Sequence, residues 1–275
     1  MNFLPTCAVV IPIYQPQPIA HEIISISNNL SVLKDYDIFL LYPKSLDLQP
    51  YQALQEQAEK EFKYLALADE NFTGIAAYNC LMTSRKIYES FNQYDYILIA
   101  QTDSYTFEDQ LGSWLLLDYD YIGAPWFEGF AQPTSNRMIN VGNGGFSLRK
   151  VEAFQQACQL LEVELSAITP ATSHKLNQIF SKTVAEFDWA SYLRGGNVSE
   201  DLYFSFVVPQ IFPDYLLAKP LPEEAAWFSF ECNAEYLYYD VTNQSLPFGC
   251  HGWNKYSHEF WANHIPYLKL LKERD

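Results

Sequence analysis

The chain carries the apolar run AVVIPIY at residues 8–14, and the polar, proline-containing sequence QPQP follows it at residues 15–18. A continuous apolar run of this length is typical of a strand buried on both faces, as in a parallel sheet. Further strands are expected at residues 36–42, 64–68 and 96–101, with helices at residues 21–33, 52–62 and 74–91. Thr73 is the candidate N-cap of the last of these helices.

The regular alternation of strand and helix predicts an α/β fold, in which helices flank a mostly parallel, doubly wound central sheet. Ligands bind such sheets at the carboxyl ends of the strands. Tyr14 and the segment Gln101-Thr102-Asp103 both stand at the expected ends of strands. We therefore expect these residues to lie close together at one edge of the sheet.

The second half of the chain is less regular. We expect a short strand with a turn at residues 120–126, a polar loop at 127–140, helices at 150–165 and 173–192, and a glycine-rich loop at 247–253. Ser199 is the candidate N-cap of a helix whose first turn carries Glu200 and Asp201. This half therefore adds helices and glycine-rich loops to the sheet of the first half.

Composition excludes some classes of partner. The 275 residues include 33 acidic and 17 basic side chains, a net charge of −16. This charge argues against a nucleic-acid-binding protein and against a polybasic membrane patch. No stretch reaches the roughly 20 apolar residues of a membrane span, and residues 1–10 lack the features of a secretion signal. Five scattered cysteines without metal-ligand spacing favour reduced thiols in a cytoplasmic protein.

A glycine-rich sequence, VGNGGFSLR, occupies residues 141–149. Glycine costs about 0.5–1 kcal/mol inside a helix or strand, so this sequence favours a sharp turn with positive φ. An apolar strand from Gly145 to Leu148 is expected to follow at once. We interpret Gly144 and Gly145 as the bare floor of a ligand site against the sheet, with a plain tight turn as the alternative.

Asp103 and His251 are candidate ligands for a hard cation. Mn²⁺ and Mg²⁺ prefer carboxylate oxygen and keep waters and substrate phosphates as further ligands, and imidazole is a common metal ligand. Lys255 is a candidate partner for a phosphate. Each residue also has a plainer explanation by position alone, since Asp103 can cap its own turn and a lone histidine or lysine is usually structural or solvated.

Glu200 and Asp201 occupy the first turn of an expected helix. The helix dipole favours negative charge there by about 0.3–1 kcal/mol, which alone explains both residues. The functional alternative is a general base that takes a proton from a substrate. Both interpretations stay open at this point.

These blocks occur together and in the same order in GT-A-fold glycosyltransferases, which the chain resembles from Val9 to Lys255. It resembles more closely an uncharacterised family of GT-A-like proteins known as a domain of unknown function. The blocks that carry the resemblance are Val9–Tyr14, Gly74–Asn79, Gln101–Asp103, Tyr119–Trp126, Val141–Arg149, Glu200–Phe204, and His251 with Lys255. The resemblance implies one GT-A-like domain over residues 1–275, with a nucleotide-binding half at 1–110, an acceptor-binding half at 111–275 and a helical insertion at about 150–198.

The resemblance also implies roles for single residues. The donor-binding candidates are Pro12, Ile13, Tyr14, Asn79, Gln101, Asp103, Asn143, Gly144, Gly145 and Lys255. The other candidates are Asp103 and His251 for a metal, Asp201 with Glu200 for catalysis, and Trp126 and Trp253 for stacking on the acceptor, with core packing as the alternative for both rings. Within the catalytic pair, Asp201 is the expected base. Gln101 stands where these enzymes carry the first aspartate of an Asp-x-Asp motif, so an amide replaces an acid.

The resemblance therefore implies an inverting, hexosyltransferase-like glycosyltransferase of the kind used in polysaccharide biosynthesis, assisted by Mn²⁺ or Mg²⁺. Its expected partners are a nucleotide-sugar donor and a glycan or other hydroxyl acceptor, with no nucleic acid and no transmembrane segment. One alternative is a non-catalytic nucleotide-sugar or glycan-binding protein of the same fold, which the substitution at Gln101 keeps open. A nucleotidyltransferase is a weaker alternative, because residues 15–18 lack the glycine-rich, basic loop of such enzymes.

Overall fold

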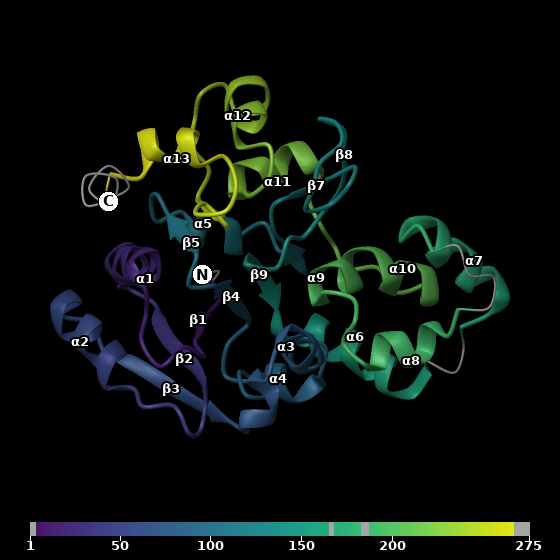
Figure 1. The fold of residues 1–275 in the computed structure, drawn as a ribbon, viewed down its shortest axis with the longest axis horizontal. Coiled ribbons are helices and arrows are strands. Elements are labelled where there is room, and N and C mark those ends of the chain that lie inside the picture. Colours follow the sequence, from purple (N-terminus) through teal and green to yellow (C-terminus); the bar gives the residue numbers. More distant parts are fainter. Residues whose placement is uncertain (1–3, 165–167, 183–186, 267–275) are drawn as a thin grey trace.

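The computed structural model describes residues 4–164, 168–182 and 187–266. Its centre is a six-stranded sheet with the order β3-β2-β1-β4-β9-β6 (Figure 1). These strands are β1 (Cys7–Pro12), β2 (Asp37–Pro43), β3 (Phe62–Leu67), β4 (Tyr96–Ala100), β6 (Tyr121–Ile122) and β9 (Phe146–Lys150). β1 pairs in parallel with β2 and β4, and β2 with β3, whereas β9 runs antiparallel to β4 and β6. The predicted mostly parallel sheet is confirmed.

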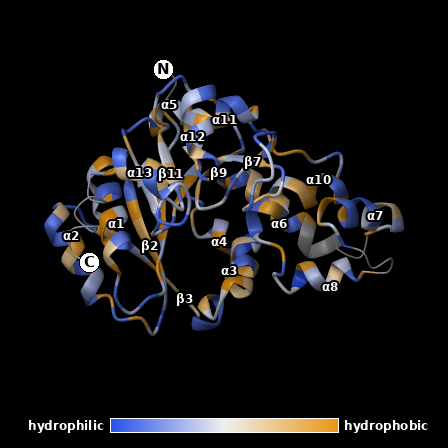
Figure 2. Cartoon of the chain, turned by 45° about the horizontal axis from the view of Figure 1, so that its top comes forward, coloured by the Kyte–Doolittle hydropathy of each residue, from blue (hydrophilic) through white to orange (hydrophobic). Residues whose placement is uncertain are grey.

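The two faces of the sheet are covered by different helices. In β1, Val9 and Ile11 pack toward α1 (Ala20–Val32) and α2 (Gln49–Ala58). Ala8 and Val10 belong to the core on the other face, with α3 (Ile75–Met82), α4 (Arg85–Glu89) and α6 (Val151–Glu164). Successive side chains of a strand point to opposite faces, so a sheet covered on both faces requires a continuous apolar run. Figure 2 shows this hydrophobic colouring in the strands at the centre of the molecule.

One helix of the first half differs from expectation. The helix expected at residues 74–91 is divided into α3 and α4. The hydroxyls of Thr83 and Ser84 each donate to a carbonyl of the last turn of α3, at 2.8 Å, and such bonds compete with the helical pattern. Thr73 is not the N-cap, because Gly74 holds that position and the Thr73 hydroxyl donates to a backbone carbonyl of the preceding turn.

Two smaller sheets join the second half to the first. β10 (Ser229–Phe230) pairs in parallel with β11 (Gly249–His251), and β11 pairs antiparallel with β5 (Ser104–Thr106) just after β4. β7 (Pro125–Phe127) and β8 (Met138–Val141) form an antiparallel pair, so the loop expected at residues 127–140 is in part a strand. The β5–β11 pair places the glycine-rich loop near the C-terminus beside the end of β4.

The helices of residues 151–211 lie to one side of the sheet (Figure 1). After α6 come α7 (Pro170–Ile179) and α8 (Trp189–Arg194). The prediction of a single helix at residues 173–192 is therefore wrong. Residues 165 and 183–186 of the expected helices lie outside the described residues. Ser199 holds the N-cap position of α9 (Glu200–Leu202), but its side chain makes no capping bond. A π-helical turn, η3 (Tyr203–Val207), leads from α9 into α10 (Val208–Ile211).

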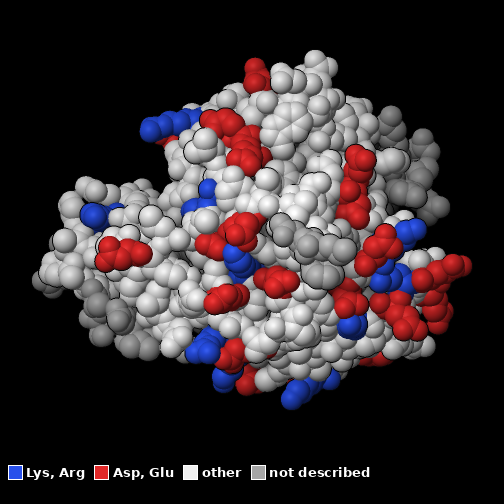
Figure 3. All heavy atoms as spheres, turned by 180° about the vertical axis from the view of Figure 1, so that it is seen from behind, with Lys and Arg blue, Asp and Glu red and all other residues white. Residues whose placement is uncertain are grey.

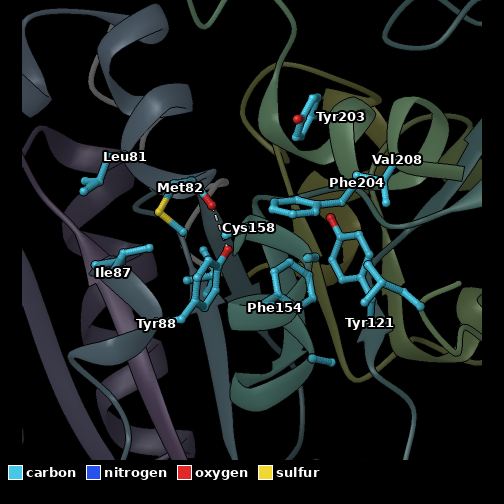
Figure 4. Close-up of a cluster of buried hydrophobic side chains, with 14 of the residues drawn as sticks. Leu81, Met82, Ile87, Tyr88, Tyr121, Phe154, Cys158, Tyr203, Phe204 and Val208 are labelled. Atoms are coloured by element: carbon cyan, nitrogen blue, oxygen red, sulfur yellow. Dashed lines mark hydrogen bonds between the residues drawn. The ribbon is translucent and has the colours of Figure 1, made fainter. Parts of the chain in front are cut away.

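Aromatic packing fixes α9 against the sheet. Figure 4 shows Tyr121 of β6, Phe154 of α6 and Phe204 of η3 pointing toward one another. The ring centroids of Phe154 lie 5.1 Å from Tyr121 and 4.6 Å from Phe204. The core beneath α9 therefore sets the position of Glu200 and Asp201.

The remaining elements are η1 (Asp69–Phe72), α5 (Leu111–Leu115), α11 (Pro222–Phe228), α12 (Ala234–Tyr236), η4 (Leu237–Val241) and α13 (His258–His264).

The surface reflects the composition. Figure 3 shows acidic side chains spread over the rear face, with basic ones scattered among them and no broad basic area there. None of the five cysteines, all within the described ranges, forms a disulfide. A search of the described helices finds none with both the length and the apolar character needed to cross a membrane.

Candidate active site

A cleft of about 590 Å³ lies at the carboxyl ends of β1 and β4. Both halves of the chain supply its walls, namely the segment after β1 with the start of α1, the start of α3, Gln101–Asp103, Gly144–Gly145, residues 199–201 and residues of the segment 251–255. Tyr14 and Asp103 both line it, so the expected meeting of the strand ends is confirmed. This is the edge at which α/β sheets of this kind bind ligands.

The floor of the cleft is bare backbone, as expected. A Cβ atom added at Gly145 would run into the imidazole ring of His251, and one at Gly144 would meet Glu200 Oε1 and lie 3.0 Å from the Cβ of Asp201. Close approach by neighbouring side chains, more than backbone conformation, therefore demands glycine at both positions. The expected positive φ occurs two residues before Gly144, at Gly142 (φ 112°).

Asn143 supports this floor without lining the cleft. Its side-chain oxygen accepts a hydrogen bond from the Gly145 N–H at 3.2 Å, and the residue is 5% exposed. The Gly145 carbonyl in turn accepts from the Gln101 N–H at 2.9 Å. The expected direct contact between Asn143 and a donor sugar is therefore replaced by a role within the turn.

Asp103 is the centre of the charged cluster in the cleft. Its Oδ1 lies 3.1 Å from His251 Nε2, and its Oδ2 lies 2.7 Å from Lys255 Nζ. The register of β5 and β11 sets Ser104 opposite His251, which explains why residues so distant in sequence meet. Burial raises the pKa of the Asp103 carboxyl, but the positive charges of His251 and Lys255 outweigh it and hold this pKa well below its usual range. The sequence analysis named these three residues as candidates for the site.

Glu231 is a member of the cluster that the sequence analysis missed. β10 and β11 pair with Phe230 opposite Cys250, so Glu231 follows beside His251. Its Oε2 lies 3.4 Å from His251 Nδ1, and the residue is 7% exposed. Burial raises the pKa of the Glu231 carboxyl. The only sequence signal was one acid in the apolar run FSFEC at residues 228–232.

His251 is therefore held on both sides of its ring. Gln101 Oε1 lies 3.1 Å from Nε2, on the same side as Asp103. Burial lowers the pKa of His251, but the carboxylates of Asp103 and Glu231 outweigh it and raise this pKa to about 10. At neutral pH the ring is accordingly an imidazolium, which adds a positive charge to that of Lys255.

Glu200 and Asp201 have different surroundings. Glu200 is 3% exposed, and its Oε1 forms an ion pair with Arg149 Nη2 at 2.8 Å. Arg149 is fully buried and also donates to the hydroxyls of Ser147 and Tyr88, each at 3.0 Å. Burial raises the pKa of Glu200, while Arg149 opposes that rise. The sequence analysis missed this role of Arg149, because an arginine at the end of a strand usually reaches solvent.

Asp201 lines the cleft and is partly exposed. Its Oδ2 accepts from the Gly144 N–H at 3.0 Å, and its Oδ1 accepts from the Leu202 N–H at 2.7 Å. These bonds hold the carboxylate at the edge of the glycine floor. Of the two acids, Asp201 is the one available to a bound molecule.

The remaining donor-binding candidates divide into two groups. Pro12 and Tyr14 line the cleft, and Tyr14 is 56% exposed. Asn79 also lines it, where its side chain donates to the Gly196 carbonyl at 2.8 Å and so joins α3 to the loop before α9. Ile13 does not line the cleft, because its side chain is 1% exposed and packs in the core. Ile13, expected to bind the donor, therefore has no side-chain surface in the cleft.

The structure contradicts the expected stacking of Trp126 and Trp253 on an acceptor. Trp253 is fully buried and donates to Ser25 Oγ at 3.0 Å. Trp126 is 6% exposed and packs against Phe130 and Phe206. Neither ring lines the cleft, so both follow the alternative of core packing.

Solved glycosyltransferases share this fold. Galactosyltransferase LgtC, in complex with donor and acceptor sugar analogues, is 11% identical, with a TM-score of 0.53 and coverage of 95% of this chain and 94% of that one. GlyE of Streptococcus pneumoniae TIGR4 is 13% identical, with a TM-score of 0.50 and coverage of 94% and 60%. The bifunctional glycosyltransferase WbbM is 13% identical, with a TM-score of 0.51 and coverage of 100% and 53%. The chain therefore has a GT-A-like fold.

Sequence comparison identifies the family. Residues 61–251 match the model described as "Protein of unknown function (DUF5672)", and because this is more than half of the chain, the protein belongs to that family. No curated protein matches the sequence. The family match and the shared fold agree with the resemblance drawn from the sequence blocks.

The contact between Gly145 and His251 generates a first prediction. Gly145→Ala should weaken nucleoside diphosphate binding at least about tenfold, or about 1.4 kcal/mol, because the new methyl group displaces the His251 ring. Gly112→Ala is the matched control, since its Cβ would meet only Leu4 Cδ2 at 3.6 Å and the Tyr36 hydroxyl at 3.9 Å. Calorimetric titration and thermal melting measure both effects. A large drop in Tm with normal binding by the folded fraction would support a plain tight turn.

Proposed function

We propose that the protein is a glycosyltransferase that moves a sugar from a nucleotide-sugar donor to a hydroxyl of a glycan or other acceptor. One observation carries this proposal. Asp103, His251 and Lys255 meet Asp201 around the bare Gly144–Gly145 floor, in a cleft at the carboxyl ends of the strands. The cleft thus combines a charged cluster that could bind a diphosphate leaving group with a carboxylate, Asp201, that could take a proton from an attacking hydroxyl.

The fold supports the same proposal. LgtC, which has a similar fold over nearly its whole length, was solved with donor and acceptor sugar analogues. Tyr14 offers an exposed aromatic ring at the rim of the cleft, suitable for stacking on a flat ring. A nucleotide-sugar donor and a sugar acceptor are therefore the partners that we propose.

A divalent cation, Mn²⁺ or Mg²⁺, fits the donor set in the cleft. His251 Nε2 lies 3.1 Å from both Asp103 Oδ1 and Gln101 Oε1. Neighbouring ligands of an octahedral cation with bonds of 2.0–2.1 Å lie about 3 Å apart. No group of three His, Cys, Asp or Glu side chains in the described ranges is arranged for a metal, so the third protein ligand would be the amide oxygen of Gln101. The cation would take the place of the proton on Nε2, since metal binding requires the neutral imidazole.

The charges of the cleft favour a cation. Its described lining includes the acidic residues Glu22, Asp103, Glu200 and Asp201, together with Lys255 and the histidines His21 and His251. A bound diphosphate adds further negative charge, which a divalent cation would neutralise on the leaving group. The Lys255 side chain is 57% exposed and ends in a flexible ammonium, so it can turn from Asp103 to a phosphate oxygen.

Asp201 is the proposed general base. It would take the proton of the acceptor hydroxyl as the oxygen attacks the anomeric carbon, while the bond to the diphosphate breaks on the opposite side and the configuration inverts. Glu200 is less suited, because it is 3% exposed and bound to Arg149. Proton NMR of the first product would show whether the anomeric configuration is inverted.

A second candidate, a non-catalytic nucleotide-sugar or glycan-binding protein, is favoured by one observation. Gln101 supplies an amide where related enzymes carry an acid, and Lys255 already neutralises Asp103. Incubation with UDP- and GDP-sugars, with and without acceptors, separates the two candidates. We expect release of a nucleoside diphosphate that depends on Mn²⁺ or Mg²⁺. Binding without any release would favour the second candidate, and no binding at all would exclude both.

The proposed cation site predicts the effect of Asp103→Asn. Affinity for Mn²⁺ at saturating nucleoside diphosphate should fall at least about tenfold, since loss of an outer-shell partner alone costs 10–100-fold. Asp118→Asn is the matched control, because Asp118 pairs with Lys150 at 2.7 Å, the same distance as the Asp103–Lys255 pair, but lies outside the cleft. Electron paramagnetic resonance of free Mn²⁺ measures the affinity. Equal Mn²⁺ affinity in Asp103→Asn and Asp118→Asn would contradict the assignment of the cation to Asp103.

The proposed base predicts the effect of Asp201→Asn. Turnover should fall at least about 100-fold while donor affinity stays near that of the wild type, because the amide keeps the shape but takes no proton. Glu200→Gln should lower Tm through the buried Arg149 and lower turnover much less. Initial rates and calorimetry on the same preparations provide the comparison. A greater loss of turnover in Glu200→Gln than in Asp201→Asn would transfer the role to Glu200.

A further inference from the structure

The two ring nitrogens of His251 face different parts of the protein. Nε2 lies at the cleft, 3.1 Å from Asp103 Oδ1 and 3.1 Å from Gln101 Oε1. Nδ1 faces away from these two groups and lies 3.4 Å from Glu231 Oε2. His251 thus connects the proposed cation position to an acid that does not line the cleft.

The location of Glu231 needs a physical reason. It is 7% exposed and stands next to Phe230 and Cys232, which belong to an apolar core cluster with Trp253. A buried carboxylate is costly unless it is paired. Within the described ranges, neither Glu231 Oε2 nor His251 Nδ1 has a hydrogen-bond partner, and the two atoms lie 3.4 Å from each other. The nearest charged partner of the buried Glu231 carboxylate is therefore the His251 ring.

The backbone makes this pairing rigid. β10 and β11 are parallel neighbours with Phe230 opposite Cys250, so Glu231, directly after β10, follows beside His251, the last residue of β11. The Gly252 N–H donates to the Asp103 carbonyl at 3.0 Å, which fixes the other side of β11. The imidazole is thus set between the carboxylates of Asp103 and Glu231.

We propose that Glu231 is a positioning residue, which accepts a hydrogen bond from His251 Nδ1–H and thereby directs the Nε2 lone pair at a cation held by Asp103 and Gln101. The inference rests on the proposed function, because it concerns the cation of that site. Without Glu231, a 180° rotation about the Cβ–Cγ bond of His251 would place the carbon Cε1 where Nε2 lies and the carbon Cδ2 where Nδ1 lies. Carboxylates that accept from the far nitrogen of a metal-binding histidine fix its orientation and raise its basicity, and their loss typically costs 10–100-fold in metal affinity.

The test measures Mn²⁺ affinity at saturating UDP or GDP, whichever the wild type binds, by electron paramagnetic resonance. Glu231→Leu removes the acceptor and should weaken affinity about 10- to 100-fold. Glu231→Gln keeps an oxygen acceptor without charge and should weaken it about three- to tenfold, since hydrogen bonds to charged groups are roughly twice as strong as neutral ones. Nucleotide affinity in the presence of EDTA should change much less. Glu224→Gln is the control, because Glu224 accepts from the Tyr119 hydroxyl at 2.9 Å and does not line the cleft.

The order wild type, Glu231→Gln, Glu231→Leu in Mn²⁺ affinity, with nucleotide affinity in EDTA nearly unchanged, supports the inference, because a merely structural defect would weaken nucleotide binding as well. If Glu231→Leu does not fold, the isosteric Glu231→Gln decides alone. Affinity of Glu231→Gln within about twofold of the wild type overturns the inference and leaves the cation site in place. A wild type that binds no Mn²⁺ even with nucleotide overturns both the inference and the metal-assisted function.

Discussion

The site depends on the pairing of β11 with β5. This pairing sets His251 opposite Ser104 and so brings its imidazole to Asp103, at the end of the central strand β4. The ring then occupies the space that a side chain at residue 145 would need, so glycine is required there. The charged cluster and the bare floor of the cleft are therefore two consequences of one backbone arrangement. A disturbance of either strand would change both at once.

A second constraint lies beneath the floor. Arg149 is fully buried, and its ion pair with Glu200 joins β9 to the first turn of α9. Burying a charged pair gains little stability, but removing one partner leaves an uncompensated charge and costs several kcal/mol. The pair therefore acts mainly by fixing the position of α9. Asp201, the next residue, is then held at the edge of the cleft by the Gly144 N–H. Of the two adjacent acids, Glu200 thus holds α9 in place through Arg149, and Asp201 faces the cleft.

Much of this arrangement is readable from the sequence, because its signals are local. The apolar run at residues 8–14 reports a strand covered on both faces, and the end of β4 marks Asp103 as a residue of the ligand edge. Glu231 was not predictable, since its role follows from the register of two short strands that are distant in sequence. The burial of Trp253 was not predictable either, because an aromatic ring suits a core as well as a sugar. Long-range register and the side that a ring faces are properties of the fold, not of a short sequence.

The central claim is that Asp103 and His251 hold a cation beside a nucleoside diphosphate above the glycine floor. Crystals grown with MnCl₂ and UDP or GDP, measured near the manganese absorption edge, test it most directly. The account predicts one strong anomalous peak within bonding distance of Asp103 Oδ1 and His251 Nε2, next to density for the diphosphate. Diphosphate density in the cleft without such a peak, or a peak bound elsewhere on the protein, would contradict it.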